Sequence, residues 1–511
     1  MSSIEEHQYG TPEANLHRGE LQVALVGVSC LAHDAGLAVL RDGRIVFASH
    51  SERYSRKKND PLLNGALVDD ALRYADEIEG IVYYEHPLLK RLRQVSARNW
   101  SAALSVSPKR YLERFPALRG KPVHFVSHHK SHAAGAYFTS PFTDAAVVVV
   151  DAIGEWDTLT VWHARDRRLR KVRSVRYPHS LGLFYSALTQ RAGLKPNEEE
   201  YILMGMAGYG TPRHRELLET ELLDRREPPD FALKRGLHRG LGPRWHPELT
   251  HAPDLASSAQ AVLESFLTRL FRWVARTVPS RNLVYTGGVA LNCLFNGRLA
   301  GMGLFDDIWI PPNPGDAGSA AGALAAHTRE FLPWEGPYLG HDIRRDSDPA
   351  RIVDALLGGT VAGLANGRAE YGPRALGNRS LLADPRDPAA KDRVNAIKKR
   401  QRYRPFAPVV LAEYADKLFE MPVAEAPYMQ YVVACREPGT YPAVCHVDGT
   451  SRVQTLRRDQ NPLLHEVISR FHQRTGCPML LNTSLNIRGR PLVNTWQDAQ
   501  DFARKYQVPV F

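Results

Sequence analysis

One pattern of strands recurs twice in the first 180 residues and restricts what the chain can fold into. In the first copy, strands are predicted at residues 23–27, 36–40 and 45–48, with Asp42-Gly43 as a hairpin turn. The second copy has predicted strands at 147–150, 158–162 and 169–175, with a turn at 165–168. In each copy a polar loop follows the first strand. The repeat predicts an α/β fold with two related halves.

This duplicated plan is similar to that of actin and the sugar kinases, whose two lobes hold ATP between them. Loops at the carboxyl ends of strands carry the ligands in α/β folds. We therefore expect His33, Asp34 and Asp151 to face the same cleft. Residues 283–292 and 308–323 are each predicted to form a strand, a glycine turn and the start of a helix. Glycines let the backbone come close to a ligand and a helix N-terminus attracts negative charge, so this pattern favours binding of a phosphate or a ribose.

A histidine pair marks a candidate metal site. Ser127 is a suitable N-cap, and in the helix that would follow it His128 and His132 leave the same face. With Asp151 at a strand end they make three ligands of a divalent metal site, and Asp316 is a candidate fourth. Chance alone gives about 0.8 histidine pairs at this spacing, so ordinary surface or core histidines are the alternative.

Length and composition limit the remaining classes. For 511 residues we expect a flexible arm over 1–20, a first domain over 21–340 and a second over 341–511. No apolar run approaches the ~20 residues that cross a membrane, and the N-terminus has no signal-peptide core. The five scattered cysteines favour the reducing cytoplasm. We expect no membrane and no nucleic-acid partner.

The net charge of +11 is concentrated in a way that suits small anionic substrates. From Arg368 through Arg404 the chain has eleven Lys or Arg and four Asp or Glu, set beside Gly and Pro turns, which favours a phosphate pocket over a solvated stripe. For each arginine taken alone, the alternative to a place in this pocket is an ordinary position on the surface. Residues 211–258 read as an insertion with short helices that faces a substrate.

Seven short motifs join these features. They are His128-His129-Lys130-Ser131-His132-Ala133, Asp151 with Gly154-Glu155-Trp156, Gly287-Gly288-Val289-Ala290-Leu291-Asn292, Gly315-Asp316-Ala317-Gly318, Gly372-Pro373-Arg374-Ala375-Leu376-Gly377-Asn378-Arg379-Ser380, Arg404-Pro405-Phe406-Ala407-Pro408 and Asn482-Thr483-Ser484. Together they resemble the NodU-type O-carbamoyltransferases, from about residue 22 to residue 500.

The resemblance implies α/β and α+β architecture, with a duplicated actin- and sugar-kinase-like domain followed by a YrdC-like α/β domain. It implies that the second domain forms carbamoyl-adenylate from carbamoyl phosphate and ATP, which would enter with Mg²⁺. The first domain then transfers the carbamoyl group, at an Fe²⁺-type metal, to a hydroxyl of a natural-product acceptor, as in antibiotic biosynthesis. The oligomeric state stays open, with a homodimer as one candidate.

The same resemblance assigns roles to individual residues. It implies metal ligation by His128, His132, Asp151 and Asp316, and nucleotide binding by Gly287, Gly288, Asn292 and Gly315. His33 would polarise the reacting carbonyl or take the acceptor proton, and Lys58 matches a basic turn. Binding of carbamoyl phosphate and ATP would fall to a cationic set in the second domain: Arg374, Lys398, Arg404, Arg452 and Ser484.

The chain also departs from the family pattern. Ile202 stands where the family commonly has a lysine, Gln401 replaces a frequent glutamate, and Phe511 ends the chain earlier than the pattern predicts. Two alternatives remain. One is a relative that makes threonylcarbamoyl-adenylate for tRNA modification, which shares both folds and would suit the basic charge. The other, which Ile202 and the early end suggest, is a degenerate nucleotide-binding regulator.

Overall fold

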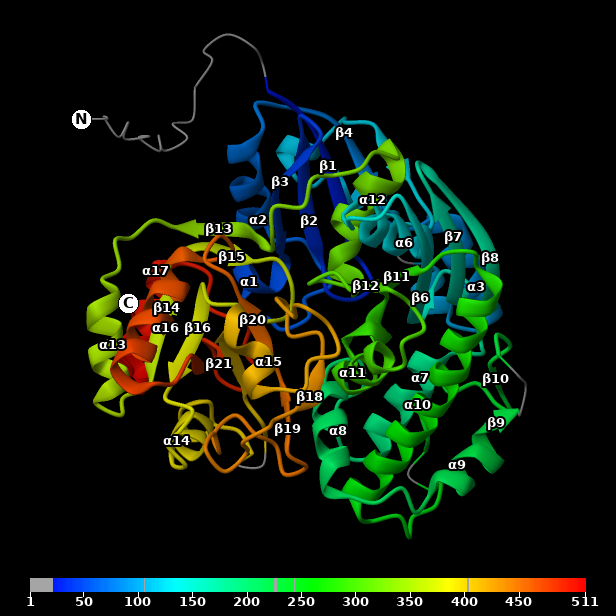
Figure 1. Ribbon diagram of the computed structural model, residues 1–511. Coiled ribbons are helices and arrows are strands. Elements are labelled where there is room, and N and C mark those ends of the chain that lie inside the picture. Colours follow the sequence, from blue (N-terminus) through cyan, green and yellow to red (C-terminus); the bar gives the residue numbers. More distant parts are fainter. Residues whose placement is uncertain (1–21, 105, 225–227, 243, 402–403) are drawn as a thin grey trace, which may run out of the picture.

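The computed structural model describes residues 22–104, 106–224, 228–242, 244–401 and 404–511. The arm expected over residues 1–20 lies outside this range. The described chain contains three five-stranded sheets, of which two belong to the first 330 residues and one to the last 150 (Figure 1).

The first two sheets have the same topology. The first has the order β3-β2-β1-β4-β5, and the second has the order β8-β7-β6-β11-β12. In both, the first three strands along the chain are antiparallel neighbours, and the last two run parallel to the first. The strands are β1 (Val23–Ser29), β2 (Gly36–Arg41), β3 (Arg44–His50), β4 (Glu77–Tyr83), β5 (Val123–Phe125), β6 (Asp144–Gly154), β7 (Asp157–Arg165), β8 (Arg168–Arg176), β11 (Asn282–Thr286) and β12 (Asp307–Trp309).

This identity of order confirms the predicted duplication. The short run from Ala145 to Val150 is buried at every position, as a strand covered on both faces must be. The turn residues Asp42, Gly43 and Asp166 have positive φ, as hairpin turns require. Strands β4 and β5, which complete the first sheet, were not predicted from the sequence.

Two small-residue helices pack together between the sheets. They are α6 (His128–Phe138) and α12 (Ser319–Thr328), and α12 also contacts β1 while α6 contacts β6 (Figure 1). A Cβ on Gly135 would lie 2.7 Å from the Gly322 Cα, so this close approach requires glycine. Ser127 occupies the predicted N-cap position, although its hydroxyl makes no capping hydrogen bond.

The third sheet has the order β14-β16-β21-β17-β20 and is mainly antiparallel. Its strands are β14 (Ala362–Ala365), β16 (Arg379–Ala383), β17 (Ala407–Leu411), β20 (Gln454–Leu456) and β21 (Met479–Ser484). Helices α13 (Pro349–Leu357), α16 (Pro462–Thr475) and α17 (Trp496–Tyr506) pack beside it, and α14 (Ala390–Ile397) and α15 (Ala415–Leu418) complete this part.

The mixed α/β class is confirmed. The predicted division between residues 340 and 341 falls inside β13 (Tyr338–Ile343), which pairs with β15 (Gly367–Glu370). One hydrophobic core also runs without a break from the second sheet into the third. The domain boundary and the YrdC-like assignment stay predictions.

The remaining elements surround the first two sheets and connect them to the third. They are α1 (Ser51–Ser55), α2 (Gly65–Ala71), α3 (Pro87–Ser96), α4 (Trp100–Ala103), α5 (Pro108–Leu112), α7 (Leu181–Arg191), α8 (Glu200–Met206), α9 (Arg215–Leu222), α10 (Ala252–Thr277), α11 (Cys293–Gly301), β9 (Leu223–Asp224), β10 (Ala232–Leu233), β18 (Val432–Ala434) and β19 (Thr450–Arg452). The predicted insertion at 211–258 thus contains a helix, a short hairpin and the start of α10. Among the described residues, none of these helices has the length and apolar character needed to cross a bilayer.

Candidate metal centre and cation cluster

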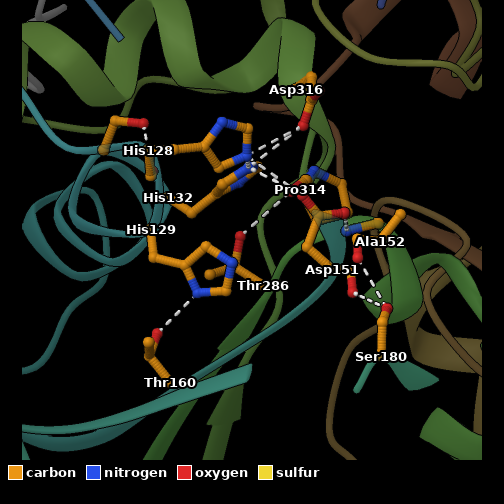
Figure 2. Close-up of polar contacts among 12 residues, drawn as sticks. His128, His129, His132, Asp151, Ala152, Thr160, Ser180, Thr286, Pro314 and Asp316 are labelled. Carbon is orange, nitrogen blue, oxygen red and sulfur yellow. Dashed lines mark hydrogen bonds and ion pairs between the residues drawn. The ribbon is translucent and has the colours of Figure 1, made fainter. Parts of the chain in front are cut away.

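Four side chains from separate parts of the chain converge between the two duplicated sheets. His128 and His132 come from successive turns of α6, Asp151 from β6, and Asp316 from the single 3-10 turn before α12 (Figure 2). One ligand atom from each lies within 4.8 Å of the others. The predicted spacing therefore brings all four proposed ligands together.

The distances show which atoms point into the cluster. His128 Nε2 lies 3.1 Å from His132 Nε2 and 3.1 Å from Asp151 Oδ2. Asp316 Oδ1 lies 3.4 Å from His128 Nε2 and 3.3 Å from His132 Nε2. Two imidazole nitrogens and two carboxylates around one point form a donor set that fits a first-row divalent metal ion.

Charge within the cluster supports the same interpretation. Burial opposes the charged form of His128, but the carboxylates of Asp316 and Asp151 outweigh it and raise the pKa of His128 well above its usual value. Burial likewise opposes ionisation of Asp316, yet His128 and His132 hold the pKa of Asp316 well below its usual value. The two carboxylates thus supply a negative field that a dication would neutralise.

Glycines make room for the cluster. A Cβ on Gly154 would lie 2.3 Å from His128 Cδ2. Gly287 has a φ of +92°, and a Cβ there would lie 2.3 Å from the Val150 carbonyl oxygen. The next amide, of Gly288, donates to Asp151 Oδ1 at 3.2 Å. The predicted Gly-Gly turn is therefore part of the metal centre.

Hydrogen bonds behind the ligands fix the backbone that carries them (Figure 2). The Ser180 hydroxyl donates to the Ala152 carbonyl at 2.7 Å, beside Asp151. The Thr286 hydroxyl donates to the Pro314 carbonyl at 3.3 Å, in the turn that leads to Asp316. His129 Nδ1 lies 2.9 Å from Thr160 Oγ1, so this third imidazole is held away from the cluster.

The loops after β1 and β4 bring further polar groups to this region. Tyr84 packs its ring 5.1 Å from the His128 ring, and the buried Tyr84 hydroxyl has no hydrogen-bond partner among the described residues. His33, on the loop after β1, has a buried Nε2 that is likewise unpartnered among them. Such groups are available to a ligand.

A second group of side chains forms a cation cluster, which we define as Arg374, Lys398, Arg400, Arg404 and Arg452. Lys398 is buried and the four arginines are half-buried. Lys398 Nζ lies 3.1 Å from Ser484 Oγ and 2.8 Å from Asn486 Oδ1. The Arg404 guanidinium lies 4.9 Å from the centroid of the Tyr201 ring. Within the described chain no carboxylate forms an ion pair with any cation of the cluster.

The pKa directions show that the charges of these cations act on one another. Burial, followed by Arg400, Arg404 and Lys58, lowers the pKa of Lys398 well below its usual value. Burial and then Arg452 lower the pKa of Arg374. A fold keeps like charges buried together at a cost, and an anion offsets that cost when it binds. The cation cluster therefore fits phosphate groups.

Lys58 lies between the two sites. Its Nζ is 3.9 Å from Glu52 Oε2, and its charge acts on Lys398 in the cation cluster. Burial opposes ionisation of Asp34, which follows His33, but His50, His33 and Lys58 together lower the Asp34 pKa. The predicted basic turn is thus a link between the loop that carries His33 and the cation cluster.

Some predicted residues have other partners. The Asn292 side chain caps α11 by accepting from the Phe295 amide at 3.0 Å, and it exchanges hydrogen bonds with Gln260. Gly315 begins the turn that contains Asp316, with open space around it. Ile202 is buried in α8.

The structure adds residues that sequence reasoning did not single out. Arg400 belongs to the basic run that drew attention to its neighbours, so its charge was a usable signal. Asn486 follows the predicted hydroxyl-and-amide cluster by two residues. Nothing in the sequence pointed to Tyr84, because β4, the strand that positions it, was not predicted.

Comparisons with known proteins agree on one family. Residues 95–325 match the family Carbamoyltransferase N-terminus, and residues 353–511 match Carbamoyltransferase C-terminus. The nodulation protein NolNO of Sinorhizobium fredii is 36% identical, covering 91% of this chain and 76% of that protein. The 3′-hydroxymethylcephem-O-carbamoyltransferase of Amycolatopsis lactamdurans is 32% identical, covering 91% of this chain and 94% of that protein.

A solved structure of full-length HypF in its phosphate- and nucleotide-bound form resembles the chain distantly. The match covers 61% of this chain and 56% of the HypF chain, with 12% sequence identity and a TM-score of 0.33. The family assignment rests on the sequence relatives.

Proposed function

Because the chain belongs to the carbamoyltransferase family and is a carbamoyltransferase enzyme, we propose that it is an ATP-dependent O-carbamoyltransferase. One water hydrolyses carbamoyl phosphate to carbamate and phosphate. A carbamate oxygen then forms a bond to the α-phosphorus of ATP as the bond from that phosphorus to pyrophosphate breaks, which gives carbamoyl-adenylate and pyrophosphate. The enzyme then transfers the carbamoyl group to a hydroxyl of a small-molecule natural product, with release of AMP.

The observation that carries this proposal is the pairing of two sites of opposite charge. The cation cluster, in which Arg452 acts on the pKa of Arg374 and Arg400 and Arg404 act on that of Lys398, suits the phosphates of carbamoyl phosphate and ATP. Its cations would offset the charge of two anionic substrates and of the departing pyrophosphate. Ser484 and Asn486 orient Lys398 for this role.

The metal centre suits the second step. A divalent ion held by His128, His132, Asp151 and Asp316 would supply charge stabilisation to the phosphate of AMP as it leaves. Fe²⁺ is our proposal for that ion, since mixed imidazole and carboxylate ligands suit it. Gly287 and Gly288 let their turn pack closely on Val150 and Asp151 beside the metal centre, and we propose that the nucleotide binds next to this turn, whereas Asn292 contributes by holding α11.

His33 and the acceptor complete the reaction. The acceptor oxygen forms a bond to the carbamoyl carbon, the bond from that carbon to the adenylate oxygen breaks, and AMP keeps the electron pair. His33 Nε2, buried and unpartnered among the described residues, either takes the acceptor proton or polarises the carbonyl. The relative from Amycolatopsis lactamdurans is named for a cephem acceptor, and a hydroxylated antibiotic precursor is our proposal for this chain.

The experiment is to assign each site to one half-reaction. We expect His132→Ala to reduce acceptor carbamoylation by about 100-fold or more while pyrophosphate release changes little. Arg404→Ala should reduce pyrophosphate release itself by about 100-fold, because a charge-assisted contact to phosphate is lost.

The matched controls are His163→Ala, on β7, and Arg457→Ala, in the same part of the chain as the cation cluster. Both should retain both half-reactions. The two-site proposal is wrong if His132→Ala and Arg404→Ala fail at the same half-reaction. Release of pyrophosphate that needs threonine would instead support the tRNA-modifying alternative.

A further inference from the structure

Helix α3 is amphipathic, but unlike a helix that covers a core it turns its apolar side chains toward solvent. Leu88, Leu92 and Val95 are spaced by four and three residues and so share one face, yet they are 68%, 52% and 41% exposed. Gln94, on the opposite face, is only 8% exposed. The polar face of α3 packs on the protein and the leucine face points outward.

Specific polar contacts hold α3 in this orientation. Lys90 Nζ pairs with Glu85 and lies 3.4 Å from the Leu31 carbonyl oxygen. The Arg93 guanidinium lies 5.8 Å from the centroid of the Tyr177 ring, just beyond β8. These contacts join both duplicated halves, so a rotation that buried the leucines would break contacts on each side.

The apolar surface continues into α4. Trp100 and Leu104 are 60% and 86% exposed. Of the twelve large hydrophobic side chains that are exposed in the described chain, seven fall within residues 88–106. We define the α3–α4 surface as Leu88, Leu89, Leu92, Val95, Trp100 and Leu104. Such concentration in one short segment indicates a binding surface.

The charged residues around the α3–α4 surface indicate which kind of partner it binds. Residues 87–112 contain six Lys or Arg and no Asp or Glu, and four of these cations, Arg91, Arg98, Lys109 and Arg110, are exposed. A second copy of the chain docked through the same surface would place these cations opposite themselves. A basic segment with leucines and a tryptophan on its outer side is instead typical of helices that lie in the interface of an anionic bilayer.

We propose that the α3–α4 surface docks this protein reversibly on anionic lipid bilayers. A helix that lies on a bilayer needs no long apolar run, so the lack of an apolar run long enough to span a membrane in the sequence does not argue against this partner. Exposed Arg98, Lys109 and Arg110 would approach lipid headgroups while Leu92 and Trp100 enter the interface.

Docking would also position the proposed active site. The His86 amide, which precedes α3, donates to Glu155 Oε1 at 2.5 Å, and Gly154 beside it packs against the His128 ring. The inner face of α3 contacts Leu31 in the loop that carries His33. If the proposed function holds, the acceptor class includes amphipathic hydroxylated molecules that partition into the bilayer.

The test is co-sedimentation of the full chain with vesicles. We expect binding to vesicles of phosphatidylcholine with about 30% phosphatidylglycerol, and at least tenfold weaker binding to phosphatidylcholine alone. The variant Leu92→Ser/Trp100→Ser should lose at least tenfold in binding to the anionic vesicles. Leu62→Ser/Val447→Ser, which removes two exposed apolar side chains elsewhere, is the matched control and should bind as the parent chain does.

Two results would overturn the proposal. One is equal binding by the surface variant and the control. The other is a dimer in light scattering that Leu92→Ser/Trp100→Ser dissociates, because the surface would then belong to a second copy. Carbamoyl-phosphate-dependent pyrophosphate release, measured without vesicles, should be the same in both variants. Failure of lipid docking is thereby distinguished from failure of the proposed function.

Discussion

Substitution of Gly154 by alanine should damage the metal centre without a change in any ligand. The new Cβ would begin 2.3 Å from His128 Cδ2, whereas such contacts in real proteins stay above 3.0 Å. The His128 ring must therefore shift by about 0.7 Å, since the packed interior offers it little freedom. Metal–ligand distances tolerate deviations of only about 0.2 Å.

We expect Gly154→Ala to weaken metal binding by about 10- to 100-fold, or about 1.4–2.7 kcal/mol, the range found when groups that orient ligands are changed. Competition with a chromogenic chelator measures this affinity, and circular dichroism checks the fold. Gly301→Ala, in α11, is the matched control because its Cβ would meet nothing within 4 Å. Equal metal affinity in the two variants would refute this view of the His128 site.

Three further predictions concern the same two sites. Removal of the metal by a chelator should stop acceptor carbamoylation and leave carbamoyl-phosphate-dependent pyrophosphate release intact, and loss of both activities together would argue against separate sites. Lys398→Met should reduce pyrophosphate release by about 100-fold. Ser484→Ala should reduce it by less than about tenfold, because Asn486 still contacts the Lys398 amine. Equal losses in the two variants would contradict the assigned roles. Since burial and nearby cations hold the pKa of Lys398 well below its usual 10.5, the unfolded chain binds a proton that the folded chain lacks at pH values between the folded-state pKa and 10.5. The free energy of unfolding should therefore gain a contribution as pH rises toward 10.5, and urea unfolding of the parent chain and Lys398→Met should show that this contribution disappears in the variant.

The strand repeat and the metal ligands could be predicted because their signals are local. Ala145–Val150 is a run that only a doubly covered strand explains, and His128 and His132 are placed by helix geometry alone. That Asp151 and Asp316 join them depends on how β6 and α12 pack, and the glycine turns gave the only sequence clue to that packing.

Other features depend on tertiary contacts that leave no local pattern. Asn292 looked free to hold a nucleotide, but Gln260, 32 residues earlier, occupies its amide. The effect of the Lys58 charge on the pKa of Lys398 joins residues more than 300 positions apart. The outward leucines of α3 could not be recognised either, because an amphipathic pattern does not say which face meets the protein.

The most direct test of the proposed chemistry is pyrophosphate release from ATP with and without carbamoyl phosphate, in the absence of any acceptor. The two-step mechanism predicts release that requires carbamoyl phosphate and that persists when the metal is removed. Release that is independent of carbamoyl phosphate, or its absence from a folded protein that binds ATP, would contradict it.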